Sequence, residues 1–197
     1  CIAAEFHLDA ASIQAALLHD VVEDTSSTSD DIEKKFGHQV AKLVDGLSKL
    51  DKVHFENDTE AQAENFRKML LAMSQDVRVI LIKLADRLHN MQTLGPLKPS
   101  KRKKISQETS EIYAPIANRL GLNSLYQELE DLSFQYIHPL RYKTIQKAII
   151  ASRGNRKEII EKTLMAIEQK LQKSVIKAEI TGREKNPASI HRKMLKK

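Results

Sequence analysis

Apolar residues recur at spacings of three and four along most of this 197-residue chain, which is the periodicity of helices that bury one face. Nine helical segments are predicted, over residues 11–24, 30–36, 39–52, 59–74, 76–94, 100–120, 123–136, 139–152 and 155–173. Glycines such as Gly37 and Gly121 follow several of these segments, as expected where a helix ends. The pattern therefore predicts an all-α fold, built as a compact array of helices.

One segment near the C-terminus departs from this pattern. Residues 175–181, VIKAEIT, alternate apolar and polar side chains as a strand does. Followed by GREKNPASIHRKMLKK, this strand predicts the opening of a second, mixed domain whose remainder lies beyond the chain. We expect a helical domain over residues 1–137, linker helices over 138–174 and the start of the second domain over 175–197.

Charge is divided unevenly along the chain. Residues 141–197 contain 16 Lys or Arg against 5 Asp or Glu, a local balance of +11, whereas residues 1–140 carry −5. A basic segment favours phosphate-containing partners, although a solvated helical face has the same composition. No apolar stretch approaches the roughly 20 residues that cross a bilayer, and the single cysteine, Cys1, cannot form an internal disulfide. We therefore expect a cytoplasmic protein that makes no membrane contact.

A histidine and three carboxylates end the first predicted helix, in the stretch ALLHDVVEDTSS. On a helix His19 lies four residues before Glu23, and Asp20 four before Asp24, so the four side chains form one stripe. Carboxylates in the last turns of a helix face the negative end of its dipole and need a compensating cation. That cation is either a surface Lys or Arg or a divalent transition metal, for which imidazole and carboxylate are suitable ligands.

A further carboxylate lies within the most apolar of the predicted helices. Residues 76–94 are apolar on nearly every face, so this helix is expected to be buried. Asp86 occupies its middle, with Asn90 and Thr93 following on the same side. An ionised carboxylate is costly to bury without a partner. Asp86 is therefore either paired with Lys83, three residues earlier, or a ligand to the cation of the acidic stripe.

These stretches together resemble a known enzyme family. HDVVED and LADRLHNM, with FGHQVAKLVDGLSKL and ETSEIYAPIANRLG in the same order, are similar to the HD hydrolase half of the RelA/SpoT homologues, the alarmone enzymes of the stringent response. The resemblance implies an HD-domain helical array that uses Mn²⁺ to remove pyrophosphate from the 3′ position of (p)ppGpp, leaving GDP or GTP. Because HDVVED is intact, the chain resembles the hydrolase-capable, SpoT-like branch.

The resemblance also assigns roles within the hydrolase site. It implies the metal ligands His19, Asp20 and Asp86, the water-activating pair Glu23 and Asp24, and the substrate contacts Asn90 and Thr93. These roles suit a divalent cation, which lowers the pKa of a water that it binds towards ~7 and offsets charge on phosphoryl oxygens. They also suit two carboxylates that divide the positioning and the deprotonation of that water.

The family has a fourth metal ligand, a histidine in an H-P-x-x-V-A motif upstream of the segment represented here by CIAAEFHLD. That motif is absent from the chain. His7 lies in the stretch that follows the motif, so it is not assigned as a ligand. We therefore expect the family's first helix to be missing and the metal site of this chain to be empty or weakly filled.

The C-terminal residues resemble the start of the family's synthetase, an α/β nucleotidyltransferase domain whose G-R-x-K…S-I…K pattern binds ATP and the guanosine nucleotide. The residues that match as phosphate contacts are Arg183, Lys185, Ser189 and Lys193. The Mg²⁺-binding carboxylates of that domain lie further on, so this chain is not expected to transfer pyrophosphate by itself. Regulatory partners are expected to act through domains outside this chain.

Two other functions fit the residues less well. The chain could be a catalytically silent regulatory module of the same family, in which case added Mn²⁺ would leave its melting temperature unchanged. The basic end could bind nucleic acid, but the chain has no Trp and few aromatic residues there for base stacking. We therefore expect no direct nucleic-acid binding and prefer Mn²⁺-dependent hydrolysis of (p)ppGpp.

Overall fold

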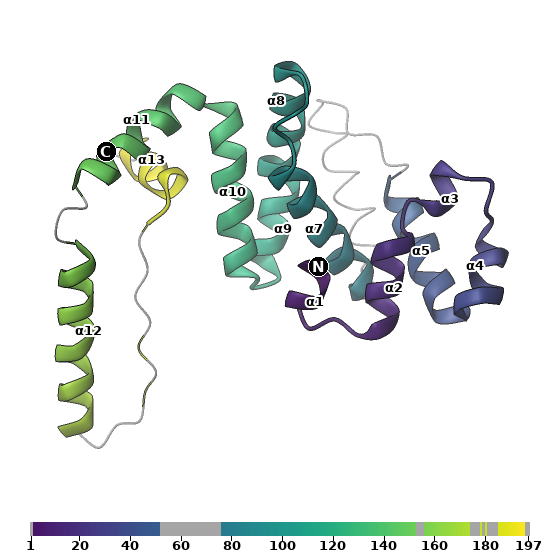
Figure 1. Cartoon of the computed structure of the whole chain (residues 1–197), viewed down its shortest axis with the longest axis horizontal. Coiled ribbons are helices and arrows are strands. Elements are labelled where there is room, and N and C mark those ends of the chain that lie inside the picture. The colour runs from purple at the N-terminus through teal and green to yellow at the C-terminus, as the bar shows by residue number, and fades with distance from the viewer. Residues whose placement is uncertain are drawn as a thin grey trace. The chain divides into compact units, whose positions relative to one another are not determined.

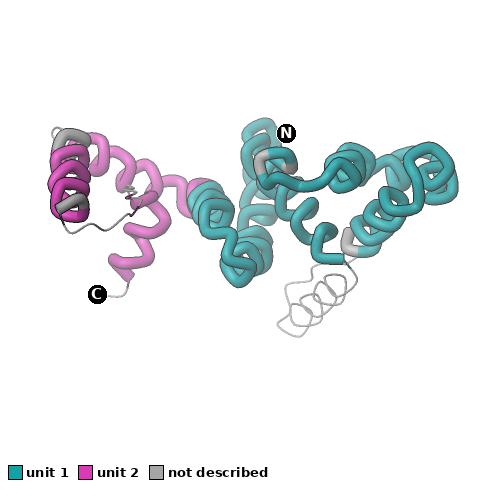
Figure 2. The backbone as a smooth tube through the Cα atoms, turned by 90° about the horizontal axis from the view of Figure 1, so that it is seen from below, with its two compact units in different colours: residues 1–133 teal, residues 134–197 magenta. Residues whose placement is uncertain are grey.

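The computed structural model describes residues 2–51, 76–152, 156–173, 178, 180 and 185–195. The elements in this part of the chain are all helices (Figure 1), which confirms the predicted all-α fold class. The chain divides into two compact units, Cys1–Ser133 and Phe134–Lys197 (Figure 2). This division falls within a helix, and the boundary expected after residue 137 stays a prediction.

The helices of the first unit follow the predicted segments closely. In chain order they are α1 (Ile2–Glu5), α2 (Ala10–Leu18), α3 (Val21–Asp24), α4 (Ser29–Phe36), α5 (His38–Asp51), α7 (Val77–Gln92), α8 (Pro99–Glu108), the π-helix η1 (Thr109–Tyr113), α9 (Ala114–Arg119) and α10 (Asn123–Ile137). The short helix α1 was not predicted. The helix expected over residues 59–74 lies outside the described residues.

The prediction of one helix over residues 11–24 is wrong, because the chain turns at His19 and Asp20 between α2 and α3. The His19 ring explains the break. Its Nδ1 lies 2.9 Å from the carbonyl oxygen of Ala16, which is the oxygen that the Asp20 N–H would bond in a continuing helix. A side chain that takes a backbone acceptor in this way competes with the helical ladder.

The segment predicted as one helix over residues 100–120 contains the π-helix η1 between α8 and α9. Pro115 lies in the first turn of α9 and has no N–H to donate to the carbonyl four residues before it, so regular α-geometry is interrupted there. The π-helix carries buried Thr109 and Tyr113. The Thr109 hydroxyl bonds the Ile105 carbonyl at 2.7 Å and faces the sulfur of Met91 at 3.3 Å.

The core of the first unit is built where α2, α5 and α7 contact one another. Helix α7 is buried on nearly every side, as its sequence predicts. It packs tightly on α5 at Gly46, where an added Cβ would lie 2.9 Å from Cγ2 of Val79. The most enclosed core side chains are Ala15, Leu43, Val44, Leu47, Ile80, Ile82, Leu84, Met91, Leu94 and Leu129. This packing fixes the two helices that carry His19 and Asp86.

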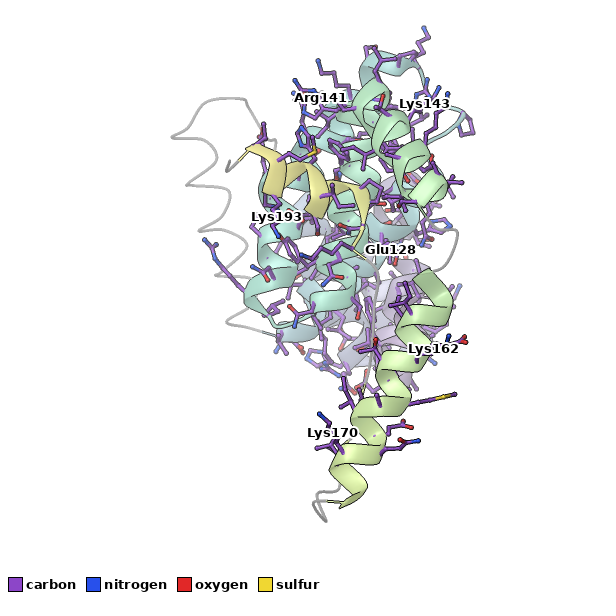
Figure 3. The ribbon with its side chains drawn as sticks, turned by 90° about the vertical axis from the view of Figure 1, so that its left-hand side faces the viewer. Glu128, Arg141, Lys143, Lys162, Lys170 and Lys193 are labelled. Carbon is purple, nitrogen blue, oxygen red and sulfur yellow. The ribbon has the colours of Figure 1, made fainter. Side chains whose placement is uncertain are left out.

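The second unit contains α11 (Pro139–Ala151), α12 (Arg156–Lys173) and α13 (Pro187–Leu195). Helices α11 and α13 contact each other, and His191 stacks on Phe134 with ring centroids 4.7 Å apart. Figure 3 shows its basic side chains, including Arg141, Lys162 and Lys170. Of the strand expected over residues 175–181, only residues 178 and 180 are described, and neither is in a strand. Searching the described residues finds no helix with the length and apolar character to span a membrane.

Candidate metal centre

The structure brings three predicted metal ligands from two segments to one place. His19 ends α2, Asp20 precedes α3, and Asp86 lies in the middle of α7. The Nε2 atom of His19 is 3.0 Å from Oδ2 of Asp20 and 3.5 Å from Oδ1 of Asp86. His19 and Asp20 are neighbours in the sequence, so the sequence alone predicted that they lie close together. Their contact with Asp86 depends on the packing of α2 against α7.

The orientation of the His19 ring decides what this cluster can bind. Its Nδ1 faces the Ala16 carbonyl, so Nδ1 carries the proton and donates it there. In a neutral ring, the lone pair of Nε2 would then point at the oxygens of Asp20 and Asp86. A lone pair opposite two carboxylates is unfavourable unless a cation lies between them, either a proton on Nε2 or a metal ion.

Both acidic partners act on the protonation of His19. The hydrogen bond to Asp86 raises the pKa of His19 above its ordinary value of 6.5, and this effect outweighs burial, which lowers the pKa. The charge of Asp20 adds to the increase. The carboxylates thus stabilise positive charge at Nε2, the position that a metal ion would occupy in place of the proton.

Asp86 is held by three neighbours. Besides His19, Lys83 Nζ lies 3.2 Å from Oδ2, and the Asn90 amide donates to Oδ1 at 3.0 Å. Burial alone would raise the pKa of Asp86, but the bond from His19 and the charge of Lys83 outweigh it and lower the pKa to about 2. The Lys83 pair that the spacing allowed is therefore present, together with the contact to His19.

The donor set fits a divalent transition metal, because one imidazole nitrogen and two carboxylates are ligands that such ions accept. The bond from Nδ1 to a backbone carbonyl is also the usual outer contact of a metal-binding histidine. In the part of the chain that the structure describes, no group of three or more His, Cys, Asp or Glu side chains is arranged so that it could hold a metal ion. The carboxylates of Asp20 and Asp86 face Nε2 of His19 as they would face a proton on that atom.

The remaining predicted hydrolase residues lie on α3 and at the C-terminal end of α7. Glu23 and Asp24 form the last turn of α3 and are exposed to solvent. Asn90 and Thr93 are exposed at the C-terminal end of α7. The Thr93 hydroxyl donates to the carbonyl of His89 at 2.9 Å. The structure thus leaves both the acidic pair and the end of α7 accessible from solvent.

A pocket of about 410 Å³ opens beside the cluster. Its lining comes from α1, α2 and α7 and consists of Ile2, Ala16, Leu17, His19, Ile82, Ala85, Asp86 and His89. The sequence analysis predicted only His19 and Asp86 among these residues. Nothing in the sequence marks the others, because their side chains match those of an ordinary amphipathic helix.

The predicted synthetase residues lie in the second unit, at or before α13. Arg183 lies outside the described residues. Lys185 and Lys193 are exposed, and the backbone N–H of Ser189 donates to the side chain of Asn186 at 2.9 Å, within the first turn of α13. Lys185 also lines a pocket of about 250 Å³ against α11. A phosphate-binding role for these four residues stays a prediction.

Comparison with known proteins places the chain in a family. A family model described as HD domain matches residues 1–123. The whole chain is 56% identical to the bifunctional (p)ppGpp synthase/hydrolase SpoT of Escherichia coli strain K12 and covers 28% of that protein. Over 98% of the chain it is 55% identical to a guanosine-3′,5′-bis(diphosphate) 3′-pyrophosphohydrolase of Vibrio cholerae serotype O1, 27% of which is covered.

A more distant relative agrees with these two. The GTP pyrophosphokinase rsh of Brucella ovis is 44% identical over 98% of this chain, with 26% of that protein covered. The chain therefore spans about a quarter of the length of the curated relatives that it matches. These matches confirm the resemblance to the RelA/SpoT homologues, and the chain belongs to the HD domain family.

Proposed function

We propose that this protein is a metal-dependent pyrophosphohydrolase that uses Mn²⁺ to release pyrophosphate from the 3′ position of (p)ppGpp, leaving GDP or GTP. The names of the Vibrio cholerae and Escherichia coli relatives support the substrate and the reaction. The observation that carries the proposal is the fixed His19 ring. Its Nε2 faces carboxylates from two different segments, an arrangement that calls for positive charge between them.

His19, Asp20 and Asp86 are the residues that would hold the metal. When bound, a divalent cation supplies Lewis acidity, which lowers the pKa of water and offsets negative charge on phosphoryl oxygens. Lys83 Nζ forms an ion pair with Oδ2 of Asp86 at 3.2 Å. This pairing leaves Oδ1 directed at His19 and fixes the plane of the carboxylate.

Glu23 and Asp24 follow Asp20 closely in the sequence and would provide the proton acceptors of the reaction. Both belong to the single turn of α3 that follows Asp20, and both are exposed. A carboxylate near the attacking water can orient it, and a second one can accept its proton during attack on phosphorus. The adjacent pair therefore supplies both tasks from one short helix.

The pocket gives the substrate a place beside the cluster. Its volume of about 410 Å³ falls within the range of small-molecule sites, and its mixture of apolar walls with a polar end is typical of them. At the end of α7, Asn90 uses its amide nitrogen on Asp86, so its amide oxygen is left to accept from a hydroxyl or amine of the substrate. The Thr93 hydroxyl donates to the backbone carbonyl of His89, and its oxygen can still accept a hydrogen bond from the substrate.

Pyrophosphate release from (p)ppGpp by the full-length protein tests the proposal. Asp20→Asn and Asp86→Asn should each reduce Mn²⁺-dependent release by more than about 100-fold, beyond the usual effect of losing an outer contact of a metal ligand. Asp45→Asn is the matched control, because Asp45 lies in an exposed ion pair with Lys49 on α5. Full activity in either test variant would contradict the proposal, as would melting temperatures that do not respond to Mn²⁺.

A further inference from the structure

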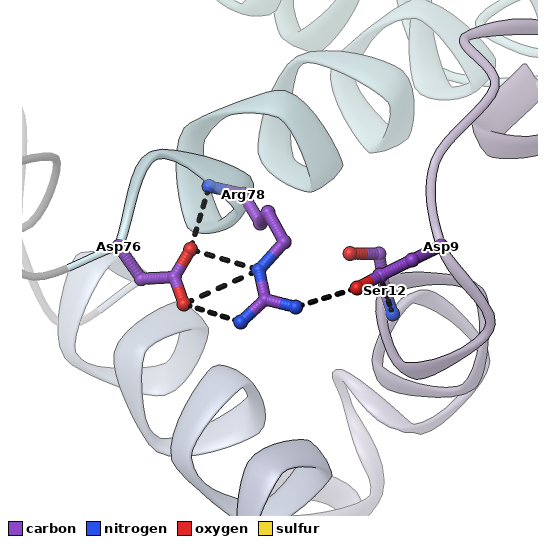
Figure 4. Close-up of polar contacts among 4 residues, drawn as sticks. All are labelled: Asp9, Ser12, Asp76 and Arg78. Carbon is purple, nitrogen blue, oxygen red and sulfur yellow. Dashed lines mark hydrogen bonds and ion pairs between the residues drawn. The ribbon is translucent and has the colours of Figure 1, made fainter.

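A single arginine joins the N-terminal ends of the two helices that carry His19 and Asp86 (Figure 4). Arg78 Nη1 donates to Oδ2 of Asp9 at 2.6 Å. On its other side, Nη2 donates to Oδ2 of Asp76 at 2.7 Å, and Nε donates to Oδ1 at 3.0 Å. Asp9 is the N-cap of α2 and Asp76 is the N-cap of α7. We call Asp9, Asp76 and Arg78 the cap bridge.

Each carboxylate of the cap bridge is fixed to the first turn of its own helix. Oδ1 of Asp9 accepts from the backbone N–H of Ser12 at 2.9 Å. Oδ1 of Asp76 accepts from the backbone N–H of Arg78 at 3.0 Å. Arg78 therefore binds two carboxylates that are each held at the N-terminus of a helix. Its planar guanidinium fixes the distance between these two helix ends.

The third helix of the core also meets Arg78. When the Gln39 amide is turned so that its oxygen faces the guanidinium, that oxygen accepts from Nη1 at 2.7 Å and from Nη2 at 3.2 Å. Gln39 lies in the first turn of α5. The Arg78 guanidinium thus has partners at the N-terminal ends of α2, α5 and α7.

The cap bridge and the metal cluster are the same distance apart on both helices. His19 follows Asp9 by ten residues, and Asp86 follows Asp76 by ten residues. At 1.5 Å per residue, each pair is separated by about 15 Å along the helix. Because Asp9 meets Arg78 at one end and His19 meets Asp86 at the other, α2 and α7 run in the same direction in matched register.

Apolar packing brings α2 and α7 together in the core, but apolar contacts are not directional. The pocket beside the cluster is lined by the small side chains of Ala16 and Ala85 as well as by larger ones such as Leu17 and Ile82. Apolar contacts therefore resist a shift of one helix along the other less sharply than hydrogen bonds with fixed geometry do. The directional contact that opposes such sliding is at the other end, at Arg78.

We propose that Arg78 is a positioning residue for the metal centre, which sets the axial register of α2 against α7 so that His19 and Asp86 can bind one ion. This inference rests on the proposed metal-binding role of these two residues. Metal-ligand distances tolerate deviations of only about 0.2 Å, so a small slip of α2 weakens binding. A partly exposed ion pair, by contrast, contributes little to the free energy of folding. The cap bridge should therefore affect Mn²⁺ affinity more than stability.

Asp9→Asn is the sharpest variant for a test. Asn is as good an N-cap as Asp, so α2 keeps its cap while the charged partner of Arg78 is lost. In the full-length protein, Mn²⁺ affinity is measured by titration, and pyrophosphate release from (p)ppGpp is followed at limiting and saturating Mn²⁺. We expect Mn²⁺ binding to weaken roughly three- to tenfold, the lower end of what losing an outer contact costs a metal site. Saturating Mn²⁺ should restore kcat, with KM for (p)ppGpp unchanged.

Two further variants keep the test decisive. Arg78→Gln should weaken Mn²⁺ binding at least as much as Asp9→Asn, and the double variant no more than Arg78→Gln alone, because both remove the same bridge. Thr28→Ala is the matched control, because it removes the N-cap of α4 and so lowers the stability of the protein, while Thr28 lies outside α2 and α7. Its Mn²⁺ affinity should equal that of the native protein.

The outcomes separate the two proposals. Unchanged Mn²⁺ affinity in Asp9→Asn and Arg78→Gln, with the native protein binding normally, would overturn the role of Arg78 and leave the metal site standing. An equal loss of affinity in Thr28→Ala would also overturn it, because general destabilisation would then explain the effect. A native protein that does not bind Mn²⁺ would overturn the proposed function, and the role of Arg78 with it.

Discussion

His19 Nε2 lies 3.5 Å from Asp86 Oδ1 although the two residues are far apart in the sequence. The contact exists because α2 and α7 pack side by side in the core. It couples the two groups, since the bond raises the pKa of His19 and helps to lower that of Asp86 to about 2. A substitution that moves α2 or α7 should therefore change the distance between His19 and Asp86 and the pKa values of both groups.

Gly46→Ala should destabilise the protein. The new Cβ would lie 2.9 Å from Cγ2 of Val79, a buried side chain of α7. Alanine gains up to ~1 kcal/mol in helix propensity, but overpacking a core costs about 1–3 kcal/mol, so we expect a net loss of about 1 kcal/mol. Urea unfolding measures the difference.

The cause of that loss can be checked by relieving the contact. Val79→Ala combined with Gly46→Ala should recover part of the stability that the two single variants lose separately. Gly95→Ala is the matched control, because nothing lies within 4 Å of its added Cβ. A Gly46→Ala protein as stable as Gly95→Ala would contradict the close packing of α5 on α7.

Arg87→Ala should be among the most destabilising substitutions. The Arg87 guanidinium lies 3.0 Å from Oε1 of Glu108 and 4.0 Å above the ring of Tyr113, and the ion pair is largely buried. Removing one partner of a buried pair costs about 3–5 kcal/mol, because the other charge stays buried without compensation. Thermal or urea unfolding would detect this loss.

An exposed ion pair provides the comparison for Arg87. Lys49→Ala breaks the pair with Asp45 on the surface of α5, and such pairs contribute about 0.3–0.5 kcal/mol. Similar losses of stability in Arg87→Ala and Lys49→Ala would contradict the conclusion that the Arg87–Glu108 pair is largely buried.

The ion pair of Asp76 with Arg78 makes the free energy of unfolding depend on pH in the acidic range. The hydrogen bond from Arg78 lowers the pKa of Asp76 below its ordinary value of 3.8. The folded protein therefore binds the proton of Asp76 less readily than the unfolded chain. The resulting stabilisation is complete above the unfolded pKa and is lost as the pH falls through the folded pKa.

Asp76→Asn tests this pH dependence and keeps an N-cap residue on α7. The native protein should be more stable than the variant at about pH 6, and the difference in unfolding free energy should shrink below about pH 4. Urea unfolding of both proteins across this range measures it. A difference that does not change with pH would contradict the ion pair between Asp76 and Arg78.

The sequence predicted most helices because their apolar spacing reflects the buried face directly. Helix α7 is the clearest case, since its apolar residues on nearly every side correspond to its central place in the core. The pairing of Lys83 with Asp86 also followed from spacing on one helix. Local spacing was therefore sufficient wherever a feature lies within a single element.

The spacing of residues along the chain could not predict features that depend on a side chain competing for a backbone hydrogen bond or on contacts between helices. The break after α2 arises because the His19 ring takes a backbone acceptor, although the residues fit a continuous helix. The bond between Arg78 and Asp9 joins residues that no periodicity connects. The pocket beside the cluster likewise takes its lining from three helices, so it appears only once they are packed.

Mn²⁺ titration of the full-length protein and its Asp86→Asn variant tests the central claim most directly, with melting temperature and bound metal as readouts. An ion that binds only the folded state must stabilise it. We predict that Mn²⁺ raises the melting temperature of the native protein and of Asp45→Asn but leaves Asp86→Asn unchanged. Equal Mn²⁺ binding by the native protein and Asp86→Asn would contradict a shared site at His19, Asp20 and Asp86.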